Sequence, residues 1–476
     1  MASNVEYAGP PLVDVNPLWK TTPLEEVCDG IYDCPHSTPK LADEGFYMVR
    51  TQDIRKGFFD TSGAVCVSDE SYNERIKRAE PSYGDVVLSR EGTYFGDAAE
   101  VPPDTKLCLG QRMVLLRPCK KQINPTFLRI WINSKNFQNY LLAFRDGTVA
   151  ERLNVSTIRK LPIPVPSLEE QAEIISLITP LEEKEALSRR MSETLEGISS
   201  ALFKSWFVDF DPVIDNALAA GNPIPEEFAV RAETRRALLR QGSGGQEAAA
   251  DFPTIGKNSS NVRKLFPDSF QTSELGPIPA GWDVSTFGDV ASAIRDSVNP
   301  SNLDADIPYV GLEHIGRKQM YLSDWGYAGD VDSNKSAFKK GDVLFGKLRP
   351  YFHKVCVMNF AGICSTDILV FRAKEDCWSG FIQYQLFDEE FVEYANARST
   401  GTRMPRASWK DMVAYPIAKP GRDVATRFAE LVAGLNAKAM LNVESASKLA
   451  RLRDTLLPKL ISGELDVSHM NQILEG

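Results

Sequence analysis

The stretch Leu161-Pro-Ile-Pro-Val-Pro-Ser-Leu-Glu-Glu-Gln171 leads into a segment with leucines at helical spacing, and much of this pattern returns 254 residues later. The same offset, without a gap, aligns Phe127, Phe137, Tyr140, Ala143, Gly147, Thr148, Arg152, Pro162, Ile163 and Pro166 with Phe381, Phe391, Tyr394, Ala397, Gly401, Thr402, Arg406, Pro416, Ile417 and Pro420. It also aligns Leu177, Leu181, Leu187, Leu195 and Leu202 with Leu431, Leu435, Leu441, Leu449 and Leu456. One offset kept over this length, with so long a period, indicates a duplicated domain and not a solenoid.

Upstream of this stretch the two copies correspond with small shifts. Trp19–Val27 resembles Trp282–Val290, and Gly84-Asp-Val-Val-Leu88 resembles Gly341-Asp-Val-Leu-Phe345, where each predicts a turn entering a buried strand. One copy therefore extends from about Val15 to Asp209 and the other from about Gly281 to Asp466.

Each copy begins with a globular part that mixes strands and helices. We expect strands at Val86–Arg90, Gln111–Arg117, Val343–Lys347 and Asp367–Arg372, and helices at Thr126–Phe144 and Phe381–Asn396 that end before a Gly-Thr loop. The predicted fold class is α+β, with two globular domains separated by long helices that form an antiparallel coiled coil with internal pseudo-twofold duplication.

Each copy ends in a segment with a heptad pattern. Positions 177, 181, 184, 188, 191, 195, 198 and 202, and positions 431, 435, 438, 442, 445, 449, 452 and 456, alternate steps of four and three. Both seams are polar in the middle, so the polar centres coincide if the helices pair antiparallel. We expect the first helix to start near Thr179, with Pro180 in its first turn, after a break. Packing of each helix on its own globular part alone is the alternative.

Pro180 to Ser205 spans 26 residues, which is ~39 Å of helix, or about one turn of DNA. A rod of this length could hold two DNA-reading domains on one face of a duplex. The segment between the two copies, residues 212–280, contains Gly242-Ser-Gly-Gly245 and Pro-rich turns and is interpreted as a linker with a short helix at Pro225–Arg240.

Composition limits the function classes. The chain has 476 residues, 54 Lys plus Arg, 64 Asp plus Glu and a net charge of −10, which argues against a protein that coats nucleic acid non-specifically. It has no apolar run long enough to cross a membrane and no secretion signal at its start, and its eight cysteines lack close paired spacings. We therefore expect a cytoplasmic protein with free thiols.

The most specific stretch is Leu161–Gln171, followed by the heptad segment and Leu202-Phe-Lys-Ser-Trp-Phe-Val-Asp-Phe210. It resembles the central conserved region of specificity subunits of type I restriction–modification systems. Phe266-Pro-Asp-Ser-Phe270 and Gly276-Pro-Ile-Pro-Ala-Gly-Trp282 are similar to that family's entry into its second target recognition domain, and Leu456–Leu465 is similar to its distal conserved region. The second copy departs from the family's signature at Pro416-Ile-Ala-Lys-Pro-Gly-Arg-Asp423, which leaves open whether both copies bind a partner identically.

The resemblance implies a non-catalytic subunit in which two domains each read half of an interrupted DNA sequence and the helices set their separation. Implied partners are double-stranded DNA, two modification subunits, which use S-adenosylmethionine, and restriction subunits, which use ATP and Mg; this chain itself would bind no cofactor. The implied domains are residues 1–150 and 281–410 for target recognition, 151–210 and 411–466 for the central and distal conserved helices, and 211–280 for the linker.

Basic clusters beside the resemblance point to a DNA-facing surface. Lys335–Lys354 carries Lys335, Lys339, Lys340, Lys347, Arg349 and Lys354 against one acid, Asp342; Arg398, Arg403, Arg406 and Lys410 have no acid between them, and neither have Arg112, Arg117, Lys120, Lys121 and Arg129. Such residues neutralise phosphates or read base edges, although a solvated surface is the usual fate of charge runs. The predicted DNA-contacting residues are Arg50, Arg55, Lys56, Arg90, Arg112, Lys347, Arg349, Tyr351, His353, Arg403 and Arg406. The predicted coiled-coil residues are Leu177, Leu181, Leu195, Leu202, Leu431, Leu435, Leu449 and Leu456.

Catalytic and metal motifs are weak in this sequence. Asn124-Pro-Thr-Phe127 is similar to the Asn-Pro-Pro-Tyr/Phe loop of amino-methyltransferases, but its third residue differs and no glycine-rich loop precedes it. Cys28, Cys34 and His36 offer three ligands where a structural zinc site needs four. An enzyme would need a cofactor loop or a metal cluster, and a coiled-coil adaptor without DNA readout would leave the two basic domains unexplained. A DNA-recognition scaffold explains all these features.

Overall fold

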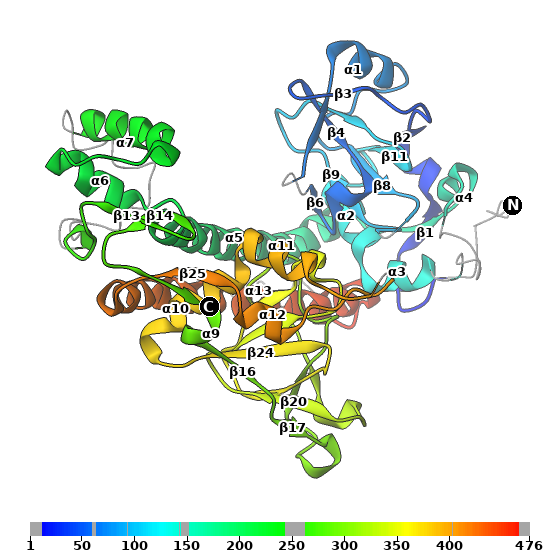
Figure 1. Cartoon of the computed structure of the whole chain (residues 1–476). Helices are drawn as coiled ribbons and strands as arrows, with labels where there is room; N and C mark the ends of the chain where they lie inside the picture. The colour runs from blue at the N-terminus through cyan, green and yellow to red at the C-terminus, as the bar shows by residue number, and fades with distance from the viewer. Residues whose placement is uncertain are drawn as a thin grey trace, which may run out of the picture. The chain divides into compact units, whose positions relative to one another are not determined.

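The computed structural model describes residues 12–59, 63–92, 94–141, 143, 152–242, 262–401 and 403–465, except for the side chains of residues 241 and 242. The chain forms two compact units (Figure 1): unit 1 comprises residues 1–184 and 448–476, and unit 2 comprises residues 185–447. Within the described ranges, no helix has the length and apolar character needed to cross a membrane.

Unit 1 is built on an antiparallel sheet of order β2-β11-β8-β9, formed by Cys28–Asp33, Met113–Pro118, Val86–Ser89 and Ala98–Glu100. Near-continuous apolar runs make the central strands β8 and β11 almost wholly buried. Helix α2 (Pro125–Asn133) packs on β8 and β9 and is followed by α3 (Lys135–Leu141) and α4 (Val155–Arg159). A pair between β1 (Lys20–Pro23) and β12 (Pro162–Val165) joins the start of the domain to the Pro-Ile-Pro-Val segment.

A second sheet of unit 1 has the order β10-β4-β7-β3, formed by Leu107–Leu109, Phe46–Val49, Val65–Val67 and Leu41–Ala42, with β4 and β10 parallel. Helix α1 (Asp69–Arg75) packs beside it, and β5 (Ile54–Arg55) pairs with β6 (Phe58–Phe59).

Unit 2 repeats the first of these sheets strand for strand. The order β16-β24-β21-β22 is formed by Ala291–Ile294, Ile368–Ala373, Val343–Gly346 and Val355–Val357, with α10 (Ser379–Phe387) packed on it, followed by α11 (Glu389–Ala397) and α12 (Trp409–Val413). β15 (Asp283–Thr286) pairs with β25 (Pro416–Lys419) as β1 pairs with β12, and α9 (Phe287–Val290) follows β15. The second sheet differs: its order is β17-β20-β23-β18-β19, formed by Ser297–Val298, Lys335–Phe338, Gly362–Cys364, Pro308–Val310 and Gly326–Tyr327.

Equivalent interactions occur at equivalent places in the two units. Arg117 binds Asp85 through two hydrogen bonds of 2.9 and 2.7 Å, and Arg372 binds Asp342 in the same way at 2.6 and 2.7 Å. The duplication read from the sequence is therefore also a duplication of the shared sheet and its buried ion pair, and the predicted α+β class is confirmed.

The four predicted strands lie within a few residues of β8, β11, β21 and β24, but the two predicted helices are each broken once. The breaks fall at Ser134 and Asp388, which correspond at the offset of 254. Ser134 accepts a hydrogen bond from the Phe137 amide, and Asp388 accepts from the Glu390 and Phe391 amides. Each residue caps a new helix, so the prediction of one continuous helix is wrong in both copies. The Gly147-Thr148 loop lies outside the described residues.

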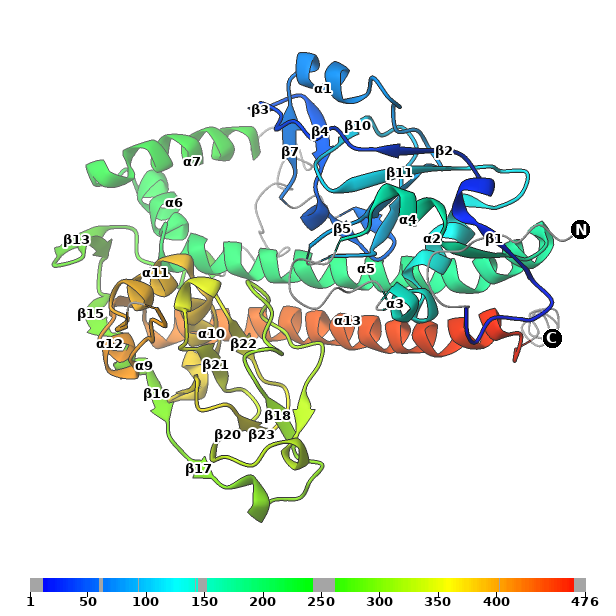
Figure 2. The ribbon, with the colours of Figure 1, turned by 90° about the vertical axis from the view of Figure 1, so that its right-hand side faces the viewer.

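Helices α5 (Leu168–Phe207) and α13 (Arg422–Ser462) are the longest elements described. In unit 1, Ile174 and Ile178 share a core cluster with Leu457, Leu460 and Ile461. In unit 2, Phe203 packs on Phe428 at 6.0 Å between ring centroids, and Ser192 Oγ donates to Ala439 O at 3.2 Å. The two helices thus pack antiparallel in each unit, side by side in Figure 2. Pro180 lies inside α5, so the predicted helix start near Thr179 is wrong.

The buried stripe of each helix differs from the predicted heptad seam. On α5 it follows positions 181, 185, 188, 192, 195, 199, 202 and 206, whereas Lys184 and Met191 are exposed. On α13 it follows positions 432, 436, 439, 443, 446, 450, 453 and 457, one residue past the predicted seam, and Lys438 and Leu452 are exposed. The heptad period holds, but its phase shifts because small and polar residues occupy much of the stripe.

The eight leucines predicted to form the coiled coil are buried to different extents. Leu202 is buried; Leu177 and Leu456 pack against the unit 1 core, and Leu195 and Leu431 pack against the unit 2 core. Leu181, Leu435 and Leu449 are half-buried.

The segment 211–280 was interpreted above as a linker, and this is wrong for its described residues. It contains α6 (Asp211–Ala220), α7 (Ala229–Gly242) and a hairpin of β13 (Phe270–Ser273) and β14 (Gly276–Pro279). Val213, Phe266 and Ile278 belong to the core of unit 2, and ion pairs join Arg231 to Asp211 and Arg235 to Asp215. The Gly242–Gly245 run is the reason for the linker interpretation; residues 243–261 lie outside the described ranges.

Candidate nucleic-acid interface

One end of the shared sheet of unit 2 brings two basic loops together. The loop Lys347–His353 follows β21, and the segment Arg398–Lys410 follows α11. Arg349 N donates to Pro405 O at 2.7 Å, and Ala407 N donates to Lys347 O at 2.9 Å. Cations that are far apart in the sequence are therefore placed on one end of the domain.

The charges at this end are mostly unneutralised. Asp367 Oδ1 lies 3.8 Å from Lys347 Nζ and 3.3 Å from Arg406 Nε, so two cations share one carboxylate. The Arg349 guanidinium lies 6.0 Å from the Phe352 ring centroid, and Arg403 is exposed and has no ion pair within the described residues. Four cations against one acid make a surface that attracts phosphate oxygens.

The loop has an unusual backbone conformation. Arg349 and His353 both adopt left-handed conformations with φ of 51°, which costs of order 1 kcal/mol or more for a non-glycine residue. At the position equivalent to Arg349, unit 1 has Gly92, with φ of 94°. Between the two left-handed residues, Tyr351 is 53% exposed. The fold thus presents an arginine and an aromatic ring from a loop in a defined conformation.

His353 does not belong to this surface. Its side chain is 5% exposed and packs on the Phe387 ring at 4.9 Å between centroids, and burial lowers its pKa, which favours the neutral imidazole. The prediction of a DNA contact for His353 is therefore wrong. Lys335 is likewise buried and donates to Ser333, and Lys354 donates to Leu312 O at 2.5 Å.

The equivalent end of unit 1 has a different charge pattern. Leu153 N donates to Arg90 O at 2.9 Å, as Ala407 N does to Lys347 O. Here Glu91 lies 3.4 Å from Arg112 Nε and 3.9 Å from Arg152 Nε. The Arg112 side chain is 56% exposed although it pairs with Glu91. Two arginines share one carboxylate here, against four cations and one carboxylate in unit 2, so this end is less positive than its counterpart.

Arg90 is a structural residue and not an exposed cation. Its side chain is 4% exposed, with Nη2 3.4 Å from Asp33 Oδ1. The prediction of a DNA contact for Arg90 is wrong, since phosphate could reach the guanidinium only if this packing opened. Arg129 is also buried and binds Glu182 of α5 through hydrogen bonds of 3.1 and 2.8 Å.

The three remaining predicted cations of unit 1 surround its second sheet. Arg50 binds Asp53 through two hydrogen bonds, and Arg55 donates to the Gln52 and Ile54 carbonyls and lies 4.5 Å from the Tyr94 ring centroid. Lys56 is exposed. Burial raises the pKa of Asp97 to about 6, and the nearby Lys56 and Arg55 oppose this shift. Arg55 and Lys56 therefore lie together near Tyr94, whereas the Arg50 guanidinium is bound by the Asp53 carboxylate.

The structure adds residues that the sequence reasoning missed. Arg152 occupies the place of Arg406, and the offset of 254 that aligns the two would have identified it. Arg317 lies 4.0 Å from the Phe352 ring centroid and extends the basic surface of unit 2. Nothing in its local sequence connects Arg317 to this loop, because the contact depends on the tertiary fold.

Metal ligation was weighed at Cys28, Cys34 and His36. Cys34 is buried, burial raises the pKa of Cys28 to about 12, and His36 Nε2 lies 3.2 Å from Asp33. In the part of the chain that the structure describes, no three His, Cys, Asp or Glu residues gather as a metal site would require.

Comparison with known proteins finds relatives of one kind. Residues 16–197 match the type I restriction modification DNA specificity domain. The specificity subunit of the type I restriction enzyme HindI of Haemophilus influenzae is 23% identical over 74% of this chain and 80% of its own length. The MjaIX specificity subunit of Methanocaldococcus jannaschii is 22% identical over 72% and 70%. The matched residues and these relatives make the chain similar to specificity subunits of type I restriction–modification systems.

A solved structure shares the fold of this chain. The S subunit of a type I system from M. genitalium has a TM-score of 0.51 and 12% identity, and the match covers 96% of this chain and 98% of that one. Specificity subunits are non-catalytic components that determine DNA recognition, and the catalytic activities of these systems belong to other subunits. The adaptor without DNA readout is not favoured.

Proposed function

We propose that each unit reads one half of an interrupted DNA sequence through the end of the shared sheet that carries Lys347 in unit 2 and Arg112 in unit 1. The observation that carries the proposal is the duplication of this sheet end, with loops joined by the same backbone hydrogen bond in both copies. Their charge patterns differ, which fits two different half-sites.

In unit 2 the contacting residues are Lys347, Arg349, Tyr351, Arg403 and Arg406, and in unit 1 they are Arg112 with Arg55 and Lys56. Arginine forks suit guanine edges and phosphates, and an exposed aromatic ring suits a sugar or a thymine methyl group. The paired helices α5 and α13 set the distance between the half-sites.

The partners follow from the same proposal. The chain holds two modification subunits, which bring S-adenosylmethionine, and restriction subunits, which bring ATP and Mg, in the cytoplasm. Methyl transfer to adenine in a defined sequence then requires both this chain and a modification subunit.

The experiment combines the purified chain with its modification subunit and incubates them with plasmid DNA and S-adenosylmethionine. We expect methylated adenines in one bipartite sequence when both proteins are present and none with either protein alone. Methyl transfer by the chain alone, or methylation without a common sequence, would contradict the proposal.

A further inference from the structure

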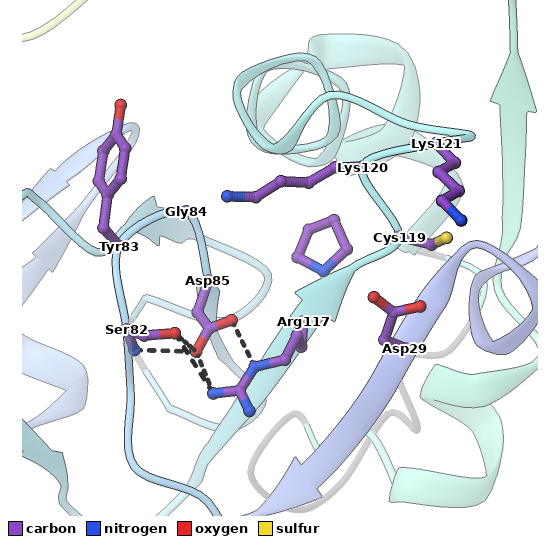
Figure 3. Close-up of a pocket in the computed structure, with 10 residues that line it drawn as sticks. Asp29, Ser82, Tyr83, Gly84, Asp85, Arg117, Cys119, Lys120 and Lys121 are labelled. Atoms are coloured by element: carbon purple, nitrogen blue, oxygen red, sulfur yellow. Dashed lines mark hydrogen bonds and ion pairs between the residues drawn. The ribbon is translucent and has the colours of Figure 1, made fainter.

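A pocket of about 450 Å³ lies at the opposite end of the shared sheet of unit 1. Its walls come from the turn before β8, the end of β11 and the loop that leads into α2, with Asp29 of β2 facing them (Figure 3). Since β8 and β11 run antiparallel from Val86 to Ser89, this pocket is separated from the Arg112 end by a strand length of ~13 Å. A ligand of one end does not reach the other.

Several polar groups of the pocket already have hydrogen-bond partners within the protein. The Asp85 side chain is 3% exposed and accepts from Arg117 and from the Ser82 amide at 2.9 Å, and Arg117 Nη2 also donates to Glu80 O at 2.8 Å. These groups form the floor and have little capacity left for a ligand.

Two lysines remain available. Lys120 and Lys121 are exposed, and within the described residues neither ammonium forms an ion pair. Lys120 extends toward Gly84 and Tyr83 in Figure 3, with Nζ 5.8 Å from the Tyr83 ring centroid. The Tyr83 side chain is itself 62% exposed. The pocket therefore presents two unpaired cations beside an exposed aromatic ring.

The loop that carries these lysines is held in place by α5. Gln171, which is fully buried in the first turns of α5, accepts from Asn124 N at 2.7 Å and donates to Gln122 O at 3.1 Å and Pro166 O at 2.9 Å. The Glu-Glu-Gln motif thus braces the rim of the pocket. A preorganised loop loses less entropy when it binds a partner.

The equivalent sheet end of unit 2 has a different charge pattern. Lys340 and Lys374 are exposed there beside the Asp342–Arg372 pair, but the exposed acids Glu375 and Asp376 follow Lys374 in the loop. This loop also lacks the brace, because Ala425 occupies the position of Gln171. The lysine-lined pocket is therefore a feature of unit 1.

We propose that this pocket of unit 1 is a docking site for an acidic segment of a protein partner, the modification subunit, with partner carboxylates at Lys120 and at Lys121, which extend in different directions (Figure 3), and an apolar group against Tyr83. This inference rests on the proposed function. A protein segment fits better than DNA because an exposed tyrosine is typical of protein interfaces.

The test measures the affinity of the full chain for the modification subunit at 0.15 M salt, before and after the double substitution Lys120→Glu and Lys121→Glu. The matched control is Lys77→Glu with Lys106→Glu, two exposed lysines of the same unit. We expect the first variant to weaken association at least tenfold and the control to change it less than twofold. Tyr83→Ala should weaken association severalfold, with unchanged thermal unfolding.

DNA binding by the assembled complex, measured against salt, distinguishes the alternative. Docking predicts that its salt slope is unchanged in the Lys120/Lys121 variant at saturating partner. Unchanged partner affinity overturns the inference, and a slope shallower by about 2 identifies a phosphate site instead. If the unaltered chain does not bind the modification subunit, the proposed function fails together with the inference. If the unaltered chain binds it and the Lys120/Lys121 variant binds as tightly as the Lys77/Lys106 control, only the inference fails.

Discussion

The basic end of unit 2 permits a quantitative test of DNA contact. The perturbation is Arg349→Gly with Arg403→Ala, which removes one half-buried and one exposed cation. Glycine is chosen at position 349 because its φ of 51° is left-handed and because Gly92 holds the equivalent place in unit 1. The variant should therefore fold normally, which thermal unfolding would check.

The expected magnitude follows from counterion release. Each phosphate contact contributes about 0.9 to the slope of log affinity against log salt, so two lost contacts should make the slope shallower by about 1.8. Between 50 and 200 mM salt, the affinity of the variant should then fall about 12-fold less than that of the unaltered protein. Fluorescence anisotropy of the assembled complex on a labelled target duplex measures both slopes.

A control removes charge elsewhere on the same unit: Lys264→Ala, an exposed residue outside both loops, should leave the slope unchanged. An Arg349/Arg403 variant with the slope and affinity of the unaltered protein would refute the reasoning, because these side chains would then face away from DNA.

Three further predictions concern stability and spacing. Arg129→Ala should lower the free energy of unfolding by about 3 kcal/mol in chemical denaturation, because it leaves the Glu182 carboxylate without its buried partner; a loss below 1 kcal/mol would contradict this. Burial raises the pKa of Glu196 from 4.5 to about 7, so the ionised side chain destabilises the folded protein increasingly as pH rises from about 4.5 to 7. Glu196→Gln should therefore stabilise the protein at pH 8 by up to about 3 kcal/mol and have little effect at pH 4. Equal effects at both pH values would contradict the assignment. Insertion of seven residues after Ser192 and seven after Ala439, which contact each other, should lengthen the DNA spacer by ~3 base pairs; an active variant that methylates sites with the original spacer would show that these helices do not set the distance.

The shared sheet could be predicted because its central strands are apolar runs of fixed length. Val86–Ser89 and Val343–Gly346 are buried on both faces, so their sequence signal does not depend on neighbours. The helix breaks at Ser134 and Asp388 were missed because apolar periodicity continues across them, although both residues are good helix caps. The capping signal was present and was outweighed by the hydrophobic one.

The phase of the coiled coil could not be found by following leucines. The buried stripe passes through Ser192 on α5 and through Ala439 and Ala446 on α13, which allow close approach of the helices, while Leu441 is 64% exposed. Small residues carry little hydrophobic weight in a sequence pattern, so the stripe is visible only when both helices are seen together.

The candidate site could be predicted only in part, because the sequence does not show which charged residues are exposed. Charge clustering identified Lys347, Arg349 and Arg403 in the loops that the fold brings together. The prediction also included Arg90 and His353, whose burial depends on Asp33 and Phe387, residues distant in the sequence. Charge is a property of the sequence, whereas exposure is a property of the tertiary structure.

The most direct test of two-part DNA reading is a map of methylated adenines produced by the modification subunit with either the unaltered chain or the Tyr351→Ala variant, which removes the exposed ring of the unit 2 loop. We expect one interrupted sequence for the unaltered chain. For the variant we expect relaxed bases in one half-site only, with the other half-site and the spacer unchanged. Relaxation of both halves together, or a continuous target, would contradict the assignment of one half-site to each unit.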